Sequence, residues 1–466
     1  MVSATLFARP AGTAARALVL LTMCLGVLVA QIDTSVVNLA LRAIKADLGA
    51  DLGSLQWVVD AYNLAYATLL LTGGVLGDLY GRRRLFALGI ALFTAGSLIC
   101  GLAPNVAALI AGRAVAGLGA ALEVPITLAI LTVAYPEPDE RALPLGIWAS
   151  CNGIAFIIGP TLGGALVDHT GWRSIFLLIV PLCLLALGLG FATVEESAAP
   201  KGRHLDLRGQ ALAILTLGAL SLGVIEGPRW GWTSPPGIAS IIVFVAALIA
   251  FLRVEARGDG AMIPLALLRA RALSAALAIA ALMTFGMYAM LFLTPLYLQS
   301  IHGSSALAAG LQLLPMSLAF VIVAQLSGWL TNALGPRVMT VGGMSLMGIG
   351  MLMMALAVTA DGLIPVEAAL LVIGIGLGLN TAPVQNVAVA AVAPERAGTA
   401  SGLVNTARMV GATLGVAVLG VLFALHGDGG AASFRLPYLV GGAGELLGAV
   451  LAFTFVAADA LKRKKA

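Results

Sequence analysis

Charged residues are scarce in this chain, at 10% of 466 residues, whereas soluble domains usually have about a quarter. Hydrophobic residues make up 60% and the mean hydropathy is +1.02, which excludes an ordinary water-soluble globular protein. Aromatic residues are also few, at 6%, so the apolar mass is mainly Ala, Leu, Val and Gly. Such side chains suit close helix packing in a lipid bilayer. The composition therefore predicts an all-α protein that crosses the membrane many times.

Cysteine is rare as well, and the sequence has none of the usual signals of enzyme chemistry. Cys24, Cys100, Cys151 and Cys183 lie in or beside apolar segments without the spacing of metal ligands, so we interpret them as small buried apolar residues. No G-x-x-x-x-G-K-[ST] loop occurs, which argues against a nucleotide as the energy source. We find no nucleophile with a matching base, and therefore expect no enzyme, no metal site and no cofactor.

Apolar segments of about 20 residues, the length that crosses a bilayer, recur along the whole chain. We expect helices at 17–41, 55–77, 85–103, 106–133, 142–167, 173–193, 210–226, 237–253, 272–299, 306–331, 337–358, 364–391, 398–424 and 437–459. The predicted fold is thus an all-α polytopic membrane protein with fourteen transmembrane helices, arranged 6+2+6. The chain divides into a six-helix bundle, a linker with two extra helices and a second six-helix bundle, at 1–194, 195–271 and 272–466.

Basic residues indicate which side of the membrane each loop occupies. With an even number of spans, both termini lie on the same side. If that side is the cytoplasm, it holds 19 of the 26 lysines and arginines, the outer side holds five, and Arg113 and Arg408 remain within spans. We therefore expect cytoplasmic termini, and we assign the net charge of +4 to membrane topology rather than to nucleic-acid binding.

Internal repeats indicate that the two six-span bundles are homologous. The stretch GVLGDLYGRRR at 74–84 returns in weakened form as GWLTNALGPRV at 328–338, at an offset of 254 residues. Two shorter matches have offsets of 255 and 252: ERA at 140–142 and 395–397, and GPTLG at 159–163 with GATLG at 411–415. Repeated bundles of this kind occur in transporters whose substrate site lies between the two halves.

Three motifs carry a family resemblance. The loop between the second and third spans fits G-x-x-x-D-x-x-G-R-R, without the usual basic residue at Leu79, through Gly74, Asp78, Gly81, Arg82 and Arg83. The fifth span fits G-x8-G-x3-G-P-x2-G, with Ala155 in place of one glycine, through Gly146, Gly159, Pro160 and Gly163. DTSVVNLALR in the first span resembles D-x-T-x-V-N-x-A-L-P, from Asp33 through Asn38, with Ser35 and Arg42 as departures.

Together these motifs are specific, and the chain resembles the major facilitator superfamily and, within it, the fourteen-span drug:proton antiporters. The resemblance implies a proton-coupled antiporter that exports lipophilic, cationic or neutral, toxic compounds by alternating access across a bacterial inner membrane. Its expected partners are the small-molecule substrate, protons and the lipid bilayer, and we expect a monomer. Two alternatives stay open: an exporter dedicated to one metabolite or self-made antibiotic, and a proton-coupled importer, against which the fifth-span motif counts.

The loop at 74–84 and the fifth span each have a physical interpretation of their own. In the loop, glycines permit a tight return, and Asp78 can pair with arginines or cap a helix N-terminus. We interpret the loop as a gate that holds two helix ends together in one state; a plain topogenic loop is the alternative. For the fifth span, the resemblance implies packing against the opposite half that resists leakage. Ordinary small-residue packing predicts the same glycines, with Pro160 as a kink.

Asp33 is an acid inside an apolar span. At about 1.5 Å per residue, Asp33 and Arg113 both lie roughly 10–12 Å below the outer surface. The resemblance implies that their two helices are neighbours around the central cavity, so we expect the two side chains to meet. A lone ionised carboxylate there costs on the order of 2.5–3.5 kcal/mol. Burial favours the neutral acid and Arg113 favours the carboxylate, so Asp33 is our candidate for a group that titrates near physiological pH. A static pair that fixes helix packing is the alternative.

Other polar residues within spans complete the list of candidates. Asp60 lies at a nearby level, and Glu123 lies about ten residues deeper than Arg113 along the same span. Glu123 is a second proton site, a partner for a cationic substrate or a structural acid with a donor not yet identified. As cavity residues we select Asn38, Met287, Tyr288, Gln385, Asn386 and Arg408. Thioethers and aromatic rings accommodate flat or cationic ligands, although such residues in membrane helices also pack or face lipid.

Overall fold

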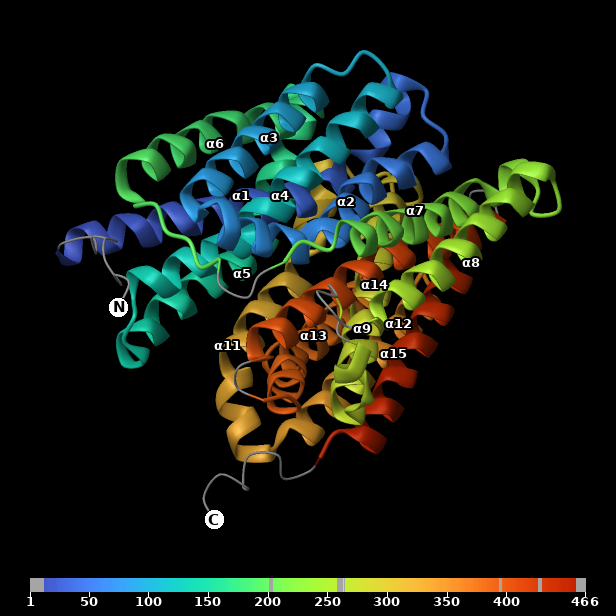
Figure 1. The fold of residues 1–466 in the computed structure, drawn as a ribbon. Helices are drawn as coiled ribbons and strands as arrows, with labels where there is room; N and C mark the ends of the chain where they lie inside the picture. Colours follow the sequence, from blue (N-terminus) through green and yellow to red (C-terminus); the bar gives the residue numbers. More distant parts are fainter. Residues whose placement is uncertain are drawn as a thin grey trace, which may run out of the picture.

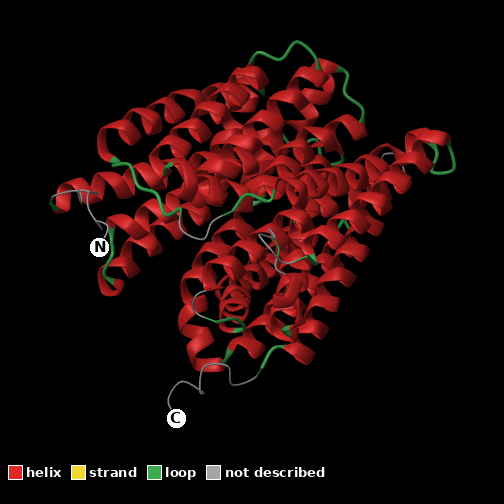
Figure 2. Ribbon diagram, in the orientation of Figure 1, coloured by secondary structure: helices red, strands yellow, loops and turns green. Residues whose placement is uncertain are grey.

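The computed structural model describes residues 12–200, 204–257, 263, 265–393, 396–425 and 430–457. Throughout these residues the regular structure is helical, which confirms the predicted class (Figure 2). The long helices are α1 (Thr13–Leu48), α2 (Leu52–Tyr80), α3 (Arg82–Gly101), α4 (Val106–Ala134), α5 (Pro138–Thr170), α6 (Arg173–Thr193), α7 (Leu207–Trp230), α8 (Pro235–Glu255), α9 (Arg271–Ser300), α11 (Leu314–Leu334), α12 (Pro336–Ala357), α13 (Ile364–Ala390), α14 (Ala397–Leu425) and α15 (Arg435–Phe455). Three short helices join them: α10 (Ala306–Gln312) and the 3₁₀ helices Leu265–Arg269 and Ala431–Phe434.

Within the described residues, thirteen candidate spans are long and apolar enough to cross a membrane, and each coincides with an expected one. The remaining expected span is α2, which has 29 residues but is less apolar. Its Gln56, Asp60 and Asn63 lower the mean hydropathy, and all three are buried inside the protein rather than exposed to lipid. The chain is therefore a multi-pass membrane protein.

The expected helix at 306–331 is instead two helices, α10 and α11, that meet at Leu313. Pro315 lies in the first turn of α11. Proline has no backbone N–H and cannot donate to the carbonyl four residues earlier, so the helical hydrogen-bond ladder is interrupted there. The first helix also differs from expectation, because it continues beyond residue 41 to Leu48.

Short polar residues begin several of these helices. The carboxylate of Asp51 accepts from Ser54 N at 2.8 Å at the start of α2, and Asn105 accepts from Ala108 N at 2.9 Å at the start of α4. Such side chains satisfy backbone donors that have no partner within the first helical turn. These caps explain why the chain can turn between α1 and α2, and between α3 and α4, over only a few residues.

The helices form two groups that differ in colour in Figure 1. Helices α1 to α6 pack on one another, as do α9 to α15. The hairpin of α7 and α8 packs against α2 of the first group and, through α7, against α14 of the second group. The two extra helices therefore lie beside the junction of the groups, without entering either one.

The two groups approach each other most closely near the α7–α8 turn and diverge toward the start of α1 and the end of α15 (Figure 1). We call these the hairpin end and the terminal end of the molecule. At the hairpin end the carboxylate of Asp168 on α5 accepts from the N–H groups of Ala306 and Leu307, each at 2.9 Å. Nearby, Gln299 on α9 donates to the carbonyl of Leu39 on α1 at 3.0 Å. Hydrogen bonds thus hold the hairpin end closed.

Glycines allow the two backbones to touch at this end. A Cβ on Gly164 of α5 would lie 2.6 Å from the Ala306 carbonyl oxygen, and one on Gly310 of α10 would meet the Pro160 carbonyl oxygen. Real Cβ atoms do not approach backbone this closely, so larger residues at these positions would separate α5 from α10.

We expect Gly164→Val to open the hairpin end, because its side chain cannot fit while α5 and α10 remain in contact. The distance between spin labels at Leu102 and Ile364, two exposed positions, should lengthen. Gly188→Val is the matched control, since no atom lies within 4 Å of a Cβ there. An unchanged label distance in Gly164→Val would contradict this account of closure.

Candidate functional site

The first group of helices contains a buried ion pair. Asp33 on α1 and Arg113 on α4 lie with Oδ2 and Nη1 2.5 Å apart, and their side chains are 1% and 2% exposed. The structure thus brings together the two residues that the sequence places at one depth. Charge-assisted hydrogen bonds are stronger than those between neutral groups, and a buried pair is screened much less than an exposed one.

Several helices hold Arg113 in place besides its contact with Asp33. Its Nε donates to the Val58 carbonyl on α2 at 2.9 Å. Its guanidinium lies 4.5 Å from the ring centre of Tyr62 and 5.9 Å from that of Phe176 on α6. The arginine therefore joins α1, α2, α4 and α6, which is the static role that the sequence left open.

Asp33 is less completely satisfied than its partner. Its second oxygen, Oδ1, is buried and accepts no hydrogen bond within the described part of the chain. A carboxylate usually accepts several bonds when it is buried, because an unsatisfied charged oxygen is costly. Asp33 therefore combines one strong charged contact with one oxygen on which a proton can reside.

Arg113→Leu should destabilise the protein by about 3–5 kcal/mol, because it leaves the Asp33 carboxylate buried and alone. Adding Asp33→Asn removes that stranded charge, so the double variant should be more stable than Arg113→Leu. Thermal unfolding in detergent measures the order. If Asp33→Asn lowers stability further on the Arg113→Leu background, the pair is not coupled as described.

Besides the buried acids at helix ends, three other acids are fully buried in the interior of helices: Asp60, Glu123 and Glu445. None of their carboxylate oxygens forms a hydrogen bond of regular geometry with a described residue, although Asn63 is close enough to interact with Asp60. The first two were candidates from the sequence and Glu445 was not. Like Asp33, Glu445 is an acid in the middle of an apolar span, so the same signal could have identified it.

Asp60 faces the junction between the two groups. On the same face of α2, Gln56 donates to the Val416 carbonyl on α14 at 3.0 Å, and Leu71 lies against Gly402. These two contacts show that α2 and α14 run antiparallel. Residues three or four apart share one face of a helix, so Asp60, four residues after Gln56, lies on the face of α2 that packs against α14. Any motion of α14 relative to α2 therefore changes the surroundings of this acid.

Glu445 lies inside the second group, on α15. Its carboxylate occupies the space that a side chain at position 286 of α9 would fill, so Gly286 makes room for it. About two helical turns closer to the hairpin end, the hydroxyl groups of Thr294 and Tyr438 lie 2.8 Å apart across the same two helices. The second group thus has a buried acid that packs against α9. In the sequence repeat, α9 corresponds to α1, the helix that carries Asp33 in the first group.

Four polar side chains from the two groups lie within electrostatic range of one another near the middle of the molecule. Tyr66 on α2 is close enough to interact electrostatically with Glu123 on α4 and with Tyr288 on α9. Tyr288 in turn interacts with Arg408 on α14, which donates to the Thr381 carbonyl at 3.5 Å. Tyr66 was not among the sequence candidates. We call Glu123, Tyr66, Tyr288 and Arg408 the central cluster.

The remaining cavity candidates are dispersed. Gln385 on α13 donates to the Ser401 hydroxyl at 2.6 Å, whereas its neighbour Asn386 is exposed. Met287 is packed in the core of the second group. On α1, Asn38 donates to the carbonyl of the residue one turn earlier at 3.3 Å, and its buried Oδ1 has no partner among the described residues. The structure therefore brings only Tyr288 and Arg408 of this set together.

The loop between α2 and α3 is held by two carboxylates rather than one. Arg82 donates to Asp78 at 2.8 Å. Glu196, in the segment after α6, accepts from the backbone N–H groups of Arg83 and Arg84 at 3.0 and 3.3 Å, and so caps α3. Of the two roles expected for Asp78, the structure shows the ion pair with an arginine. The helix cap comes from Glu196, which was not among the candidates from the sequence.

The glycines of this loop differ in importance. Gly81 has a φ of 108°, in the region that favours glycine, and a Cβ there would lie 2.6 Å from the Glu196 carboxylate. A Cβ on Gly74 would meet only ordinary contact, with Pro125 at 3.9 Å. The turn therefore depends on Gly81.

The fifth-span motif faces two partners. A Cβ on Gly163 would lie 2.7 Å from Val36, and one on Gly159 would meet Ser35, so both glycines let α5 pack against α1 within the first group. The carbonyl of Pro160 instead meets Gly310 across the junction. Gly146 has no atom within 4 Å of a Cβ position. Only part of the motif therefore contacts the opposite half.

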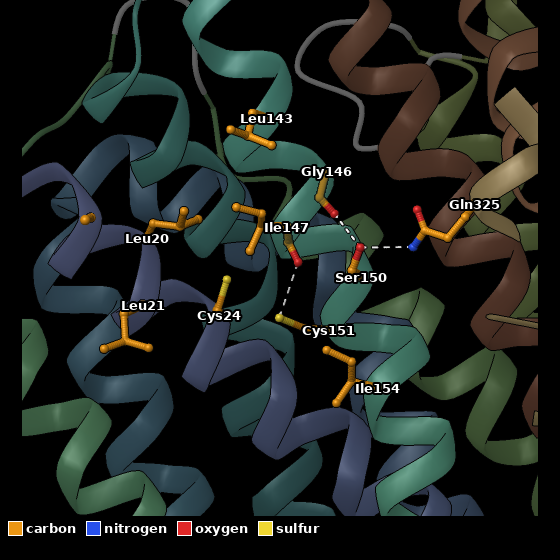
Figure 3. A pocket seen from close by; sticks show the side chains of 11 residues that line it. Leu20, Leu21, Cys24, Leu143, Gly146, Ile147, Ser150, Cys151, Ile154 and Gln325 are labelled. Carbon is orange, nitrogen blue, oxygen red and sulfur yellow. Dashed lines mark hydrogen bonds between the residues drawn. The ribbon is translucent and has the colours of Figure 1, made fainter. Parts of the chain in front are cut away.

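Gly146 borders a pocket of about 580 Å³ (Figure 3). The pocket is lined by residues of α1 and α5, with Gln325 of α11 opposite them. Its walls are mainly aliphatic, and none of the four buried acids or the central cluster borders it. A polar bridge crosses its rim, because Gln325 donates to the Ser150 hydroxyl at 3.1 Å.

Two packed groups of apolar helices, with one buried ion pair inside the first group and polar residues at their junction, are typical of a membrane transport protein. The sequence model of the Major Facilitator Superfamily matches residues 23–416, and the chain belongs to this family. The resemblance found in its motifs is thereby confirmed.

Several relatives of the chain have names that refer to drugs. It is 40% identical over 412 residues to the multidrug resistance protein Stp of Mycobacterium tuberculosis (strain CDC 1551 / Oshkosh), covering 87% of this chain and 76% of the relative. It is 34% identical to the tetracenomycin C resistance and export protein of Streptomyces glaucescens, covering 87% and 75%. It is also 34% identical to a methylenomycin A resistance protein of Bacillus subtilis (strain 168), covering 94% of each.

Solved structures resemble the chain in fold. A peptide transporter, POT, in complex with sulfate superposes with a TM-score of 0.71 at 17% identity, covering 93% of each chain. A bacterial homologue of the human lysosomal transporter Spinster, in an inward-facing and unoccupied conformation, superposes with a TM-score of 0.70 at 18% identity, covering 97% of this chain and 98% of the other. At these identities the likeness concerns the fold alone.

Proposed function

We propose that this protein is a secondary antiporter of a bacterial inner membrane that exports lipophilic drugs in exchange for protons. The drug resistance and export relatives support the export of drugs. Buried acids in both helix groups support the coupling to protons. We further propose that it works as a monomer, with the proton gradient as its energy source and no bound cofactor.

The distribution of basic residues supports a cytoplasmic terminal end and an outer hairpin end. In that orientation the bonds of Asp168 and Gln299 close the outer side, and the diverging terminal ends open toward the cytoplasm. An exporter collects its substrate in this state. Breaking the outer contacts and closing the inner side would then release the substrate outward.

The single observation that carries the coupling is the Asp33–Arg113 pair. Protonation of Asp33 removes the charge that attracts Arg113, while Arg113 keeps its bond to Val58. Asp33 lies on the same helix as Leu39, whose carbonyl accepts the outer-side bond from Gln299. A change of proton occupancy therefore acts on the helix that takes part in closing the outer side.

The available energy depends on the number of protons exchanged. One pH unit is worth about 1.36 kcal/mol per proton, and 100 mV is worth about 2.3 kcal/mol per charge. Exchange of one proton for one monovalent cation moves no net charge and uses only the pH difference. A second proton uses the voltage as well, and Asp60, Glu123 or Glu445 can supply its site.

The central cluster supports a substrate with both flat apolar surface and some positive charge. Tyr66 and Tyr288 present aromatic rings from opposite halves, and rings of this kind attract cations. Glu123 is an acid within electrostatic range of Tyr66, whereas Arg408 is a base within electrostatic range of Tyr288. Because one relative is named for the export of tetracenomycin C, a dedicated antibiotic exporter is the second candidate. Resistance to a single compound on expression would favour it.

Asp33→Asn should abolish substrate efflux driven by an imposed pH gradient in vesicles, because position 33 can no longer exchange a proton. Binding of the substrate should persist, since the central cluster is unchanged. Glu226→Gln is a matched control, because this acid accepts from Trp57 at 3.0 Å at the end of α7, outside the pair. Normal proton-driven efflux by Asp33→Asn would refute the proposed coupling.

Glu123→Gln should weaken the binding of a cationic dye more than that of a neutral compound of similar size, because it removes the acid of the central cluster. Equilibrium binding to the purified protein measures both affinities. Equal losses for the two ligands would mean that Glu123 supports the fold and does not recognise charge.

A further inference from the structure

Two of the four cysteines lie close together in the wall of one pocket. Cys24 on α1 and Cys151 on α5 both line the pocket of Figure 3, and with Val27 they form one small apolar cluster. Their thiols are close enough to interact with each other. The Cys151 thiol also donates to the Ile147 carbonyl at 3.5 Å. Both cysteines are free thiols.

The other two cysteines have different surroundings. Cys100 and Cys183 are 1% and 0% exposed, and neither borders the pocket. Cys100 lies instead near Arg113, and Cys183 lies inside the first group of helices. The chain therefore contains one pair of thiols on a cavity and two isolated thiols that can serve as internal controls.

The pocket can hold an organic group next to the two sulfur atoms. Leu20 and Leu21 of α1, with Ile147 and Ile154 of α5, surround the thiols in Figure 3. Its volume of about 580 Å³ falls within the range of about 300–1,000 Å³ typical of small-molecule sites. Leu21 and Ile154 are 56% and 44% exposed, so the pocket is open at its edge rather than sealed.

The donor atoms limit the kind of ligand. Sulfur donors select soft, thiophilic elements. Within the described residues no group of three or more His, Cys, Asp or Glu is placed to hold a metal ion, so a four-coordinate metal has too few ligands here. A trivalent arsenic atom with one organic substituent needs two sulfur atoms and an apolar space. We propose that Cys24 and Cys151 form a binding site for monosubstituted trivalent arsenicals.

The reaction is balanced without an oxidant or a reductant. The arsenic atom of an arsenical R–As=O bonds to the sulfur of each cysteine, and two As–S bonds form as the arsenic–oxygen bonds and the two S–H bonds break. Both thiol protons leave with the oxygen as one molecule of water, and arsenic remains trivalent. Once the first As–S bond has formed, the second thiol reacts within the same molecule at a high effective concentration.

Occupancy of this site should also affect transport, a consequence that rests on the proposed function. Gln325 on α11 completes the pocket wall and bonds to Ser150 on α5, so the two helix groups meet at this rim. A substituent held by the thiols on α1 and α5 would fill the space into which α11 moves when the terminal end closes. We therefore expect the bound arsenical to stop efflux.

Phenylarsine oxide is the probe, added to the purified full-length protein without any drug. One arsenical per chain should bind and consume two thiols, as counted by intact mass and by thiol labelling. The double variant Cys100→Ala/Cys183→Ala should behave in the same way. Cys24→Ala and Cys151→Ala should each bind about 100-fold more weakly, because they cannot close the ring. Dimercaptopropanol should release the arsenical.

Dibromobimane gives a second measurement that needs no change to the pair. This reagent becomes fluorescent when it bridges two thiols, so the Cys100→Ala/Cys183→Ala chain should fluoresce. Absence of that fluorescence, unchanged arsenical binding in Cys151→Ala, or one thiol consumed per arsenic would each overturn the site. Because these assays involve no transport, their failure leaves drug export intact. Binding without inhibition of efflux would overturn only the expected effect on transport.

Discussion

The structure depends on the charge of Arg113, which is buried away from solvent inside the first helix group. Arg113 is held by a carboxylate, a backbone carbonyl and two aromatic rings from three neighbouring helices. An arginine in this position cannot lose its proton, so its partner must adapt. Asp33 is the partner that can change charge, and its free oxygen is where that change can occur. The packing of the first helix group and the proposed coupling therefore share one interaction.

The same helix links this pair to the junction between the groups. Downstream of Asp33, α1 reaches the bond between Leu39 and Gln299 at the hairpin end, and upstream it lines the thiol pocket through Cys24. Its packing partner α5 takes part in both regions, through Asp168 at one end and Ser150 near the other. Movement of one rigid pair of helices would alter both ends of the junction together, as alternating access requires.

Most of the fold could be predicted from the sequence because length and hydropathy determine how often a chain crosses a bilayer. The level of Asp33 and Arg113 followed from helical rise alone. Glu196 was not foreseen, because nothing in a polar segment reveals which helix end it will cap. Tyr66 was not foreseen for a related reason. Glu123 and Tyr288 are distant from it in sequence, and they come within electrostatic range only because α2 packs on α4 and also lies at the junction with the second group.

The central claim is that Asp33 changes its protonation during the cycle. Isotope-edited infrared spectroscopy of the Asp33 carboxyl, recorded with the hairpin end closed and again with it held open, measures this directly. The account predicts a protonated carboxyl in one state and a carboxylate in the other. The same band in both states would contradict it.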